Sequence, residues 1–591
     1  MSIIVFDTEV YRDYFLAAFK DTTSGKVRFF EMYDGHPLDR DGLKRALQSR
    51  HTFVSFNGIN FDLPVLFTAI QCGDCAKVKA VCDDIIARNK KHWQVIRERK
   101  ITTFDINHID LIEVAPGVAT SLKLFGGRMH APKLQDLPIA PDASISPDQR
   151  EMLRTYCVND LDTTAMLYHR LAPQIALREQ MGGEYGEELR SKSDAQIAES
   201  VIGHQLREMS ITPTKPVIPP GTAFKYNIPC FVSFRTEQLR NVLDIVRGAD
   251  FVVADTGSIK MPKELDSLSI TIGNSVYRMG IGGLHSSEER QTIIPAEDEL
   301  LLDIDAASMY PTIILEQGLY PKHLTSKFLS MYKAIVDRRI AAKHSGDKVV
   351  ADSLKITVNG SFGKLGSKYS FLYSPDLLIQ TTLSGQLCLL MLIERIEAGV
   401  GRVVSANTDG IVILVKKALY SELLNVVSEW EFETGFTMEE TRYRSIHSES
   451  VNNYIAVKPS GETKGKGIYA DSGLMKNPAN TICSKAVKAF LSSGVSIDET
   501  IRGCADVREF VTVRTVNGGA EWCGQYVGKT VRWYYTTSNG APMTYIKNGN
   551  KVPKSDGCKP LQNLPDEFPS DVDFDWYIAE AEKMLTNLGV K

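Results

Sequence analysis

The sequence lacks several features that would place it at once in a familiar class of protein. Its 68 lysines and arginines do not outnumber its 72 aspartates and glutamates, and the net charge is -4. Composition alone therefore gives no indication of nucleic-acid binding, although a local basic groove would be enough to bind phosphates. The ten cysteines form no regular framework. This favours a reducing compartment, and we expect a cytoplasmic location.

Signals for secretion, membrane insertion and zinc binding are weak. Asp7 interrupts the apolar N-terminus after a few residues, so we do not expect a signal peptide. We also expect no apolar run long enough to span a membrane. Cys72, Cys75 and Cys82 have no convincing second ligand pair, so free thiols are expected. The length of 591 residues and the 43% hydrophobic content predict a globular protein of several domains.

Local patterns predict several elements. Residues 2–10 and 52–56 are typical of buried strands. A helix is predicted from Ser146 to about Ala172, because Ser146 is a good N-cap and a proline follows it at the first helical position. Pro173 should end that helix.

Further helices are predicted at residues 328–343 and 348–362, as an antiparallel hairpin, and at about 573–588. Proline-rich stretches at residues 213–220 and 553–569 mark a boundary and a loop, because proline continues neither a helix nor a strand ladder.

A first group of acids lies in the N-terminal third. Asp7 and Glu9 are two apart on a predicted strand and share a face. Asp62 follows the next strand, and Tyr156 and Asp160 are four apart on a helix. Alone, each pattern is common and carries no function. Together, four carboxylates are enough to hold two divalent ions ~3.5–4 Å apart, as in two-metal hydrolysis of a phosphodiester.

A second group lies further along the chain. Asp305 ends an alternating strand and is followed by Ser308 and by Tyr310-Pro311; Asp303 shares its strand face. Asp409-Gly410 lies between two apolar strands. Alone, it is best explained as a hairpin turn. Phosphoryl transfer needs metals, positioning and charge neutralisation, and two carboxylates from separate segments suit that need.

A lysine, an amide and a ring share one helix face between these acids. Lys355, Asn359 and Phe362 fall at i, i+4 and i+7. The ordinary explanation is a solvated lysine beside a buried phenylalanine. The functional explanation is a cation aimed at phosphates.

In order and spacing, residues 305–311, 355–363 and 407–410 resemble motifs A, B and C of family B DNA polymerases, and the first acids are similar to the three exonuclease motifs of proofreading polymerases. The resemblance implies an α/β and α+β multidomain fold, with a ribonuclease H-like exonuclease domain followed by a right-hand polymerase. It implies these domains: exonuclease 1–205, first part of the palm 206–325, fingers 326–364, second part of the palm 365–470 and thumb 471–591.

For the exonuclease, the resemblance implies that Asp7, Glu9, Asp62 and Asp160 bind metal and that Tyr156 positions the nucleophile. Asn57 and Phe61 would contact the 3′ end of a strand, and Lys133 is a weaker candidate for the scissile phosphate.

For the polymerase, the resemblance implies that Asp305 and Asp409 hold Mg²⁺, or Mn²⁺, with two ions per active site. Implied nucleotide contacts are Ser308, Met309, Tyr310, Arg338, Lys355 and Asn359, with the ring of Tyr310 under the sugar. Arg339 is an alternative to Arg338, because the sequence does not decide which one faces inward. Implied DNA contacts are Phe362, Gly363, Tyr454 and Lys466.

The chain departs from the family in several places. Asn407 replaces a second acid of motif C, Gly410 replaces a serine, Phe362 replaces a tyrosine and Asn452 replaces the lysine of a Lys-x-Tyr element, for which Lys464 and Lys466 are candidate substitutes. Only 50 residues separate Asp305 from Lys355. This leaves no room for the long insertion of protein-primed polymerases, so a compact phage or mobile-element type is expected.

The expected function is template-directed addition of dNTPs to a primer 3′-hydroxyl, with 3′→5′ proofreading. Expected partners are primer-template DNA and dNTPs, with a processivity factor or single-strand binding protein as a candidate; a monomer without membrane contact is expected. The alternatives are a protein-primed polymerase and, from another class, an inactive nucleic-acid-binding relative.

Overall fold

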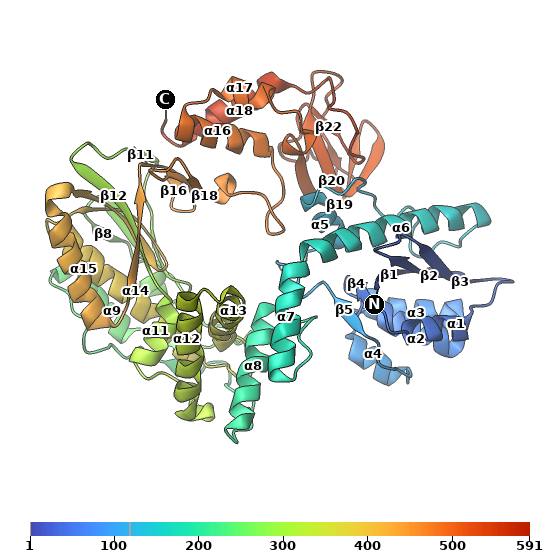
Figure 1. The fold of residues 1–591 in the computed structure, drawn as a ribbon, viewed down its shortest axis with the longest axis horizontal. Helices are drawn as coiled ribbons and strands as arrows, with labels where there is room; N and C mark the ends of the chain where they lie inside the picture. The colour runs from blue at the N-terminus through green and yellow to red at the C-terminus, as the bar shows by residue number, and fades with distance from the viewer. Residues whose placement is uncertain (1, 118–119, 591) are drawn as a thin grey trace. The chain divides into compact units, whose positions relative to one another are not determined.

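The computed structural model describes residues 2–117 and 120–590, and its contacts group the chain into two compact units (Figure 1). Unit 1 comprises Met1–Ser193, Ser472–Ile482 and Ile501–Tyr577. Unit 2 comprises Asp194–Asp471, Cys483–Thr500 and Ile578–Lys591. Both are mixed α/β assemblies of segments far apart in sequence. The segment 471–591, predicted to be a thumb, contributes to both units, and the division into five domains stays a prediction.

Unit 1 is built on a five-stranded sheet in the order β3-β2-β1-β4-β5. Its strands are β1 (Ile3–Val10), β2 (Tyr14–Asp21), β3 (Val27–Tyr33), β4 (Thr52–Ser55) and β5 (His108–Asp110). β1 runs antiparallel to β2 and parallel to β4. The strands predicted at 2–10 and 52–56 are confirmed as β1 and β4.

Among the described residues, seven helices belong to the N-terminal part of unit 1. They are α1 (Arg40–Leu47), α2 (Asp62–Cys72), α3 (Cys75–Ile86), α4 (His92–Glu98), α5 (Leu122–Arg128), α6 (Pro147–Arg170) and α7 (Ala172–Tyr185). Apolar residues alternate along β1: Phe6 joins a core that includes residues of α1 to α4, whereas Val5 joins a core that includes Leu161 of α6. The acids of β1 therefore share the α6 side with Val5.

The predicted start of α6 is confirmed. The Ser146 side chain accepts a hydrogen bond from the Gln149 backbone N–H, and Gln149 completes a capping box. The prediction for Pro173 is half right: α6 ends at Arg170, but Pro173 stands in the first turn of α7, where its missing N–H costs nothing.

The C-terminal part of unit 1 is a four-stranded sheet in the order β21-β19-β20-β22. Its strands are β19 (Thr512–Trp522), β20 (Gln525–Tyr535), β21 (Thr544–Tyr545) and β22 (Cys558–Pro560). Arg532 of β20 is fully buried and donates to the carbonyl oxygen of Ala131 at 2.8 Å and to that of Leu561 at 2.7 Å. Part of the predicted thumb therefore packs against the predicted exonuclease segment, within one unit.

Unit 2 is built on a seven-stranded antiparallel sheet in the order β15-β12-β14-β13-β10-β9-β8. Its strands are β8 (Ile270–Ile272), β9 (Ser275–Met279), β10 (Leu284–Ser286), β12 (Glu299–Ala306), β13 (Arg402–Asn407), β14 (Gly410–Lys416) and β15 (Met438–Tyr443). A second sheet contains β11 (Gln291–Ile293), β16 (Ser445–Ser450), β17 (Asn453–Val457) and β18 (Thr463–Lys466), and a small one contains β6 (Ala223–Phe224) and β7 (Phe251–Val252).

The helices of unit 2 include the predicted hairpin, formed by α12 (Lys327–Ser345) and α13 (Lys348–Leu365) (Figure 1). The others are α8 (Asp194–Glu208), α9 (Glu237–Gly248), α10 (Lys263–Asp266), α11 (Met309–Glu316), α14 (Pro375–Glu397) and α15 (Tyr420–Thr434). The unit boundaries fall inside α16 (Thr481–Ser493), α17 (Ile497–Arg502) and α18 (Phe574–Asn587), the last of which confirms the predicted final helix. Short 3-10 helices are η1 (Lys322–Leu324), η2 (Lys417–Leu419), η3 (Gly467–Tyr469) and η4 (Val507–Glu509).

Helix α14 corrects one expectation. By length and composition it could cross a membrane, although no such run was expected from the sequence. However, 83% of its most apolar window is buried inside unit 2, among residues such as Leu387 and Leu392. A core helix passes the same test, so α14 is weak evidence for a membrane span.

Two candidate acidic sites

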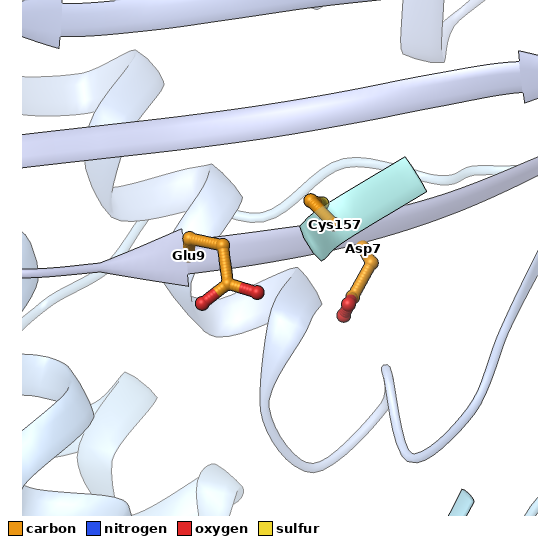
Figure 2. A group of neighbouring side chains, drawn as sticks. All are labelled: Asp7, Glu9 and Cys157. Atoms are coloured by element: carbon orange, nitrogen blue, oxygen red, sulfur yellow. The ribbon is translucent and has the colours of Figure 1, made fainter. Parts of the chain in front are cut away.

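Strand β1 places two acids side by side in the first site. Asp7 pairs with Ala18 and Glu9 with Leu16 across the β1–β2 ladder, so both side chains leave the same face of β1. Figure 2 shows Asp7 and Glu9 together with Cys157 of α6. One carboxylate oxygen of each acid and the Cys157 Sγ all lie within 4.8 Å of one another.

Asp62 and Asp160 reach this place from two helices. Asp62 opens α2, is 2% exposed and accepts a hydrogen bond of 2.6 Å from the hydroxyl of Thr8. Asp160 is buried one turn after Tyr156 on α6. The negative charges of Asp62 and Asp160 both help to raise the pKa of Asp7, which shows that the four acids share one electrostatic environment. We call Asp7, Glu9, Asp62 and Asp160 the four-acid site.

A lysine that sequence analysis missed lies at this site. Lys123 of α5 forms an ion pair with Asp160, and its ammonium lies 4.3 Å from the centre of the Tyr156 ring. Lys133, the candidate taken from the sequence, forms a backbone β-bridge with Asn563. No ion pair joins Lys133 to the four acids within the described chain.

The four-acid site is short of positive charge. Burial, followed by the charge of Asp62, raises the pKa of Asp7, and burial followed by Asp160 raises that of Glu9. Burial also raises the pKa of Asp62, to about 7, and that of Asp160 despite Lys123. A divalent cation that prefers oxygen ligands relieves the repulsion between buried carboxylates by binding their oxygens. The donor set therefore fits Mg²⁺ or Mn²⁺.

The loop after β4 is held by an acid that was not predicted. Asp110 is 1% exposed and accepts hydrogen bonds from the backbone N–H groups of Asn57, at 2.7 Å, and Ile59, at 2.9 Å. Asn57 has a left-handed backbone, with φ of 69°. Asn57 and Phe61 are half-buried just before α2, next to Asp62, so the loop carries both predicted contacts for a DNA end beside a predicted metal ligand.

The second site lies where two neighbouring strands of unit 2 end. Asp305 of β12 pairs with Gly410 of β14, and Asp409 lies in the two-residue turn between β13 and β14. The two explanations of Asp409-Gly410, a hairpin turn and a site acid, are therefore compatible. We call Asp305 and Asp409 the two-acid site. A Cβ on Gly410 would lie 1.8 Å from the Asp305 Oδ1, so a serine at this position would require the Asp305 carboxylate to move.

A cavity of about 400 Å³ opens beside Asp409. Its lining includes Ser308, Met309, Tyr310, Pro311, Arg339, Lys355, Val358, Asn359, Phe362 and Asp409. These residues come from α11 and its N-cap Ser308, the two hairpin helices and the β13–β14 turn. The structure thus brings together most residues predicted to contact a nucleotide, at a volume suited to a small ligand.

Three residues predicted to contact the nucleotide or DNA can be placed relative to this cavity. Arg339, not Arg338, lines it and donates to the Ser308 hydroxyl at 2.7 Å, whereas Arg338 is exposed. The Tyr310 ring stacks on Phe362, with ring centres 4.1 Å apart, and its hydroxyl donates to the Gly282 carbonyl oxygen. Gly363 lies outside the residues that line the cavity, is exposed and has open space around its missing side chain, and its predicted DNA contact stays a prediction.

Asp303 has partners that distinguish it from Asp305. It is 6% exposed and accepts hydrogen bonds from the Tyr443 hydroxyl at 2.6 Å and the Lys464 ammonium at 3.0 Å. Burial, followed by the charge of Asp303, raises the pKa of Asp305 to about 6. Asp303 is therefore already paired, and Asp305 is the acid that still needs a cation.

The departures from the family pattern cluster near this site. The Asn407 amide donates to the Asn452 side-chain oxygen at 3.5 Å, so the missing acid and the missing lysine are replaced by two amides in contact. Tyr454 of β17 pairs with Lys466 of β18, which places these two predicted DNA contacts next to each other.

No protein-family model and no curated protein matches the chain. Among solved structures, a family B DNA polymerase from the hyperthermophilic archaeon Pyrobaculum calidifontis is similar, with 14% sequence identity and a TM-score of 0.41. The match covers 100% of this chain and 78% of that one.

Proposed function

We propose that the chain is a template-directed DNA polymerase with 3′→5′ exonuclease activity. The observation that carries the proposal is the cavity beside the two-acid site. Its lining combines Asp409 with two cations, Lys355 of α13 and Arg339 of α12. It also includes the stacked rings of Tyr310 and Phe362. Acids, cations and rings around one small cavity are what a nucleoside triphosphate requires, since it combines a metal-bound polyanion with a sugar and a base.

Each group has a role that follows from its chemistry. Divalent ions held by Asp305 and Asp409 would neutralise charge on the phosphates and activate the attacking 3′-oxygen. Lys355 and Arg339 bind phosphate oxygens, and the backbone N–H groups at the start of α11 favour an anion there. Tyr310 supports the sugar and leaves no space for a 2′-hydroxyl.

The four-acid site would hydrolyse the 3′ end of a strand. Its four carboxylates suit two divalent ions, which would neutralise the scissile phosphate. Tyr156 orients the attacking water, and Asn57 and Phe61 hold the terminal nucleotide. Lys123 balances part of the charge of Asp160 until metal and DNA are bound.

Priming from an ordinary nucleic-acid 3′-hydroxyl is part of the proposal. α11, η1, α12 and the first half of α13 account for the chain between Asp305 and Lys355, and only Gly346 and Asp347 separate the two hairpin helices. No segment there is available to receive a priming protein. A compact phage or mobile-element origin, action as a monomer in the cytoplasm and a processivity or single-strand binding partner belong to the same proposal.

A primer-extension assay on a labelled primer-template tests the proposal. With Mg²⁺ and all four dNTPs the primer should lengthen, and without dNTPs it should shorten from its 3′ end. A protein that changes the primer in neither condition would favour an inactive nucleic-acid-binding relative. Transfer of labelled dAMP to a partner protein, without extension of the primer, would favour protein priming.

A further inference from the structure

The Cys157 thiol lies at the four-acid site and has no role in the reaction proposed above. It is fully buried on α6 and adjoins Tyr156. Its Sγ and one oxygen each of Asp7 and Glu9 lie within 4.8 Å of one another (Figure 2). Within residues 2–117 and 120–590, it is the only group of three His, Cys, Asp or Glu side chains arranged closely enough to hold one ion.

The two carboxylates lack partners of their own. Glu9 is 8% exposed, and neither its side chain nor that of Asp7 accepts a hydrogen bond from any residue that the structure describes. Asp7 is partly exposed, and the charge of Lys123 offsets part of the rise in the pKa of both acids, but the Lys123 ammonium is ion-paired with Asp160. A carboxylate that is buried or crowded by other acids and accepts no hydrogen bond is unfavourable, so both side chains are available to ligate a cation. The thiol faces the same place from α6, and the cluster is therefore a set of three ligands rather than a lone cysteine.

A sulfur atom changes which ions this set prefers. Mg²⁺ takes oxygen ligands in an octahedral arrangement and gains little from a thiol. Zn²⁺ binds both cysteine sulfur and carboxylate oxygen, often with three protein ligands and one water. Soft thiolate ligands favour zinc-like ions over magnesium.

We propose that Asp7, Glu9 and Cys157 form a site for a thiophilic divalent cation of the Zn²⁺ or Cd²⁺ type, which competes with Mg²⁺ for the two carboxylates. On binding, the Cys157 thiol loses its proton to solvent and its sulfur becomes a ligand. The consequence for DNA trimming rests on the proposed exonuclease function. A tetrahedral ion with three protein ligands leaves one open position, too few for both the scissile phosphate and the attacking water, so such an ion would inhibit trimming.

Cadmium is a suitable probe, because its bond to a thiolate absorbs in the ultraviolet. Full-length protein, freed of metal by a chelator, is titrated with Cd²⁺ and then with Mg²⁺. Wild-type protein should show an absorbance component that excess Mg²⁺ removes. Cys157→Ser and Asp7→Asn should each lose that component, and the Cd²⁺ affinity of the site should fall by about tenfold or more. Cys483→Ser, a change at another buried thiol, should keep it.

The outcomes separate the metal site from the proposed activity. A Mg²⁺-sensitive component that survives Cys157→Ser in protein with a normal circular dichroism spectrum overturns the site. Trimming in Mg²⁺ that Zn²⁺ inhibits equally in wild type and in Cys157→Ser overturns the inhibitory role. A protein that shows the component but trims no DNA in Mg²⁺ supports the metal site and overturns the exonuclease function.

Discussion

The two acidic sites differ in the charges that surround their carboxylates. The four-acid site gathers four carboxylates around the ammonium of Lys123. At the two-acid site burial raises the pKa of Asp409, but the charges of Lys466 and Lys464 offset part of that rise, and Lys355 and Arg339 line the adjoining cavity. The first site must take up cations before it can accept a phosphodiester. The second already has cations for a polyanion. This difference fits hydrolysis at one site and nucleotide addition at the other.

The largest expected effect tests whether the two sites are independent. Asp305→Ala should reduce primer extension by about a thousandfold or more, because it removes a carboxylate that the catalytic metals require. Trimming of single-stranded DNA should continue, since its acids belong to another unit. The measurement is single-turnover incorporation beside trimming on the same preparation. Normal extension by Asp305→Ala would show that this acid is misassigned.

Changes at the four-acid site should have the opposite effect, with trimming lost and primer extension retained. Changing Asp7 and Glu9 together to Ala should lower the rate of 3′-end trimming by about a hundredfold or more, because both metal ligands of β1 are lost. Extension should be retained. If the purified double variant still trims DNA, hydrolysis takes place at another site. Asp110→Asn is not a suitable control, because the Asp110 side chain holds the adjoining loop.

A smaller effect concerns the choice of sugar. Tyr310→Ala should lower the preference for dNTP over rNTP by roughly tenfold to a hundredfold, because in the proposed function the ring would occupy the space that a 2′-hydroxyl needs. Tyr310→Phe is the matched control, since it keeps the ring and loses only the hydrogen bond to the Gly282 carbonyl oxygen. The ratio of kcat/KM for dNTP and rNTP decides the matter. An unchanged ratio in Tyr310→Ala would assign the selection to another residue.

Asp303→Asn tests the distinction between Asp303 and the metal-ligand candidate Asp305 at the two-acid site. It should raise the KM for primer-template by about tenfold with little change in kcat, because Lys464 loses its charged partner but the metal ligands remain. Tyr443→Phe, which removes the other hydrogen bond to Asp303, should act more weakly. If instead kcat collapses in Asp303→Asn, Asp303 rather than Asp305 is a metal ligand.

The smallest effect compares two buried acids of unit 1. Although burial raises its pKa, hydrogen bonds from Arg88 and Arg99 lower the pKa of Asp84 to about 2. Because this lies below the unfolded value of 3.8, the stabilisation is full above about pH 4 and is lost as the pH falls towards 2. Asp84→Asn should therefore cost about 2 kcal/mol at pH 7.5.

Asp62 is the matched control for Asp84, because each is 2% exposed. Its pKa is raised to about 7, so its charge destabilises the metal-free protein as the pH rises through that value. Asp62→Asn should leave the thermal midpoint at pH 7.5 without divalent ions unchanged or higher. A lower midpoint in Asp62→Asn than in Asp84→Asn would contradict the contrast between a stabilising acid and a ligand acid.

Local signals in the sequence were sufficient for much of the fold. β1, β4, α6 and the α12–α13 hairpin follow from strand alternation, helix caps and helical periodicity, all of which act within a few residues. The sequence was also sufficient to select Arg339, rather than Arg338, as the arginine that faces inward. Phe328, Tyr332 and Ile335 mark the buried face of α12, and Arg339 continues it at i+4 from Ile335.

Other contacts at the two acidic sites could not be predicted from the sequence. Lys123 contacts Asp160, which lies 37 residues away in the sequence, and Tyr443 contacts Asp303, which lies 140 residues away. Such contacts depend on how strands and helices pack, which spacing along the chain does not reveal. For the same reason the sequence did not indicate that residues 471–591 are divided between the two compact units. The roles of the site residues in catalysis stay predictions.

The chain crosses between its two units five times, after Ser193, Asp471, Ile482, Thr500 and Tyr577. No single cut therefore yields two fragments that each encode one whole unit. A fragment ending at Ser193 would lack β19 and β20 and would leave the Ala131 carbonyl oxygen without the Arg532 guanidinium. Independent expression of either half should give an incomplete core, and a split version would recover only if its fragments associate and exchange segments.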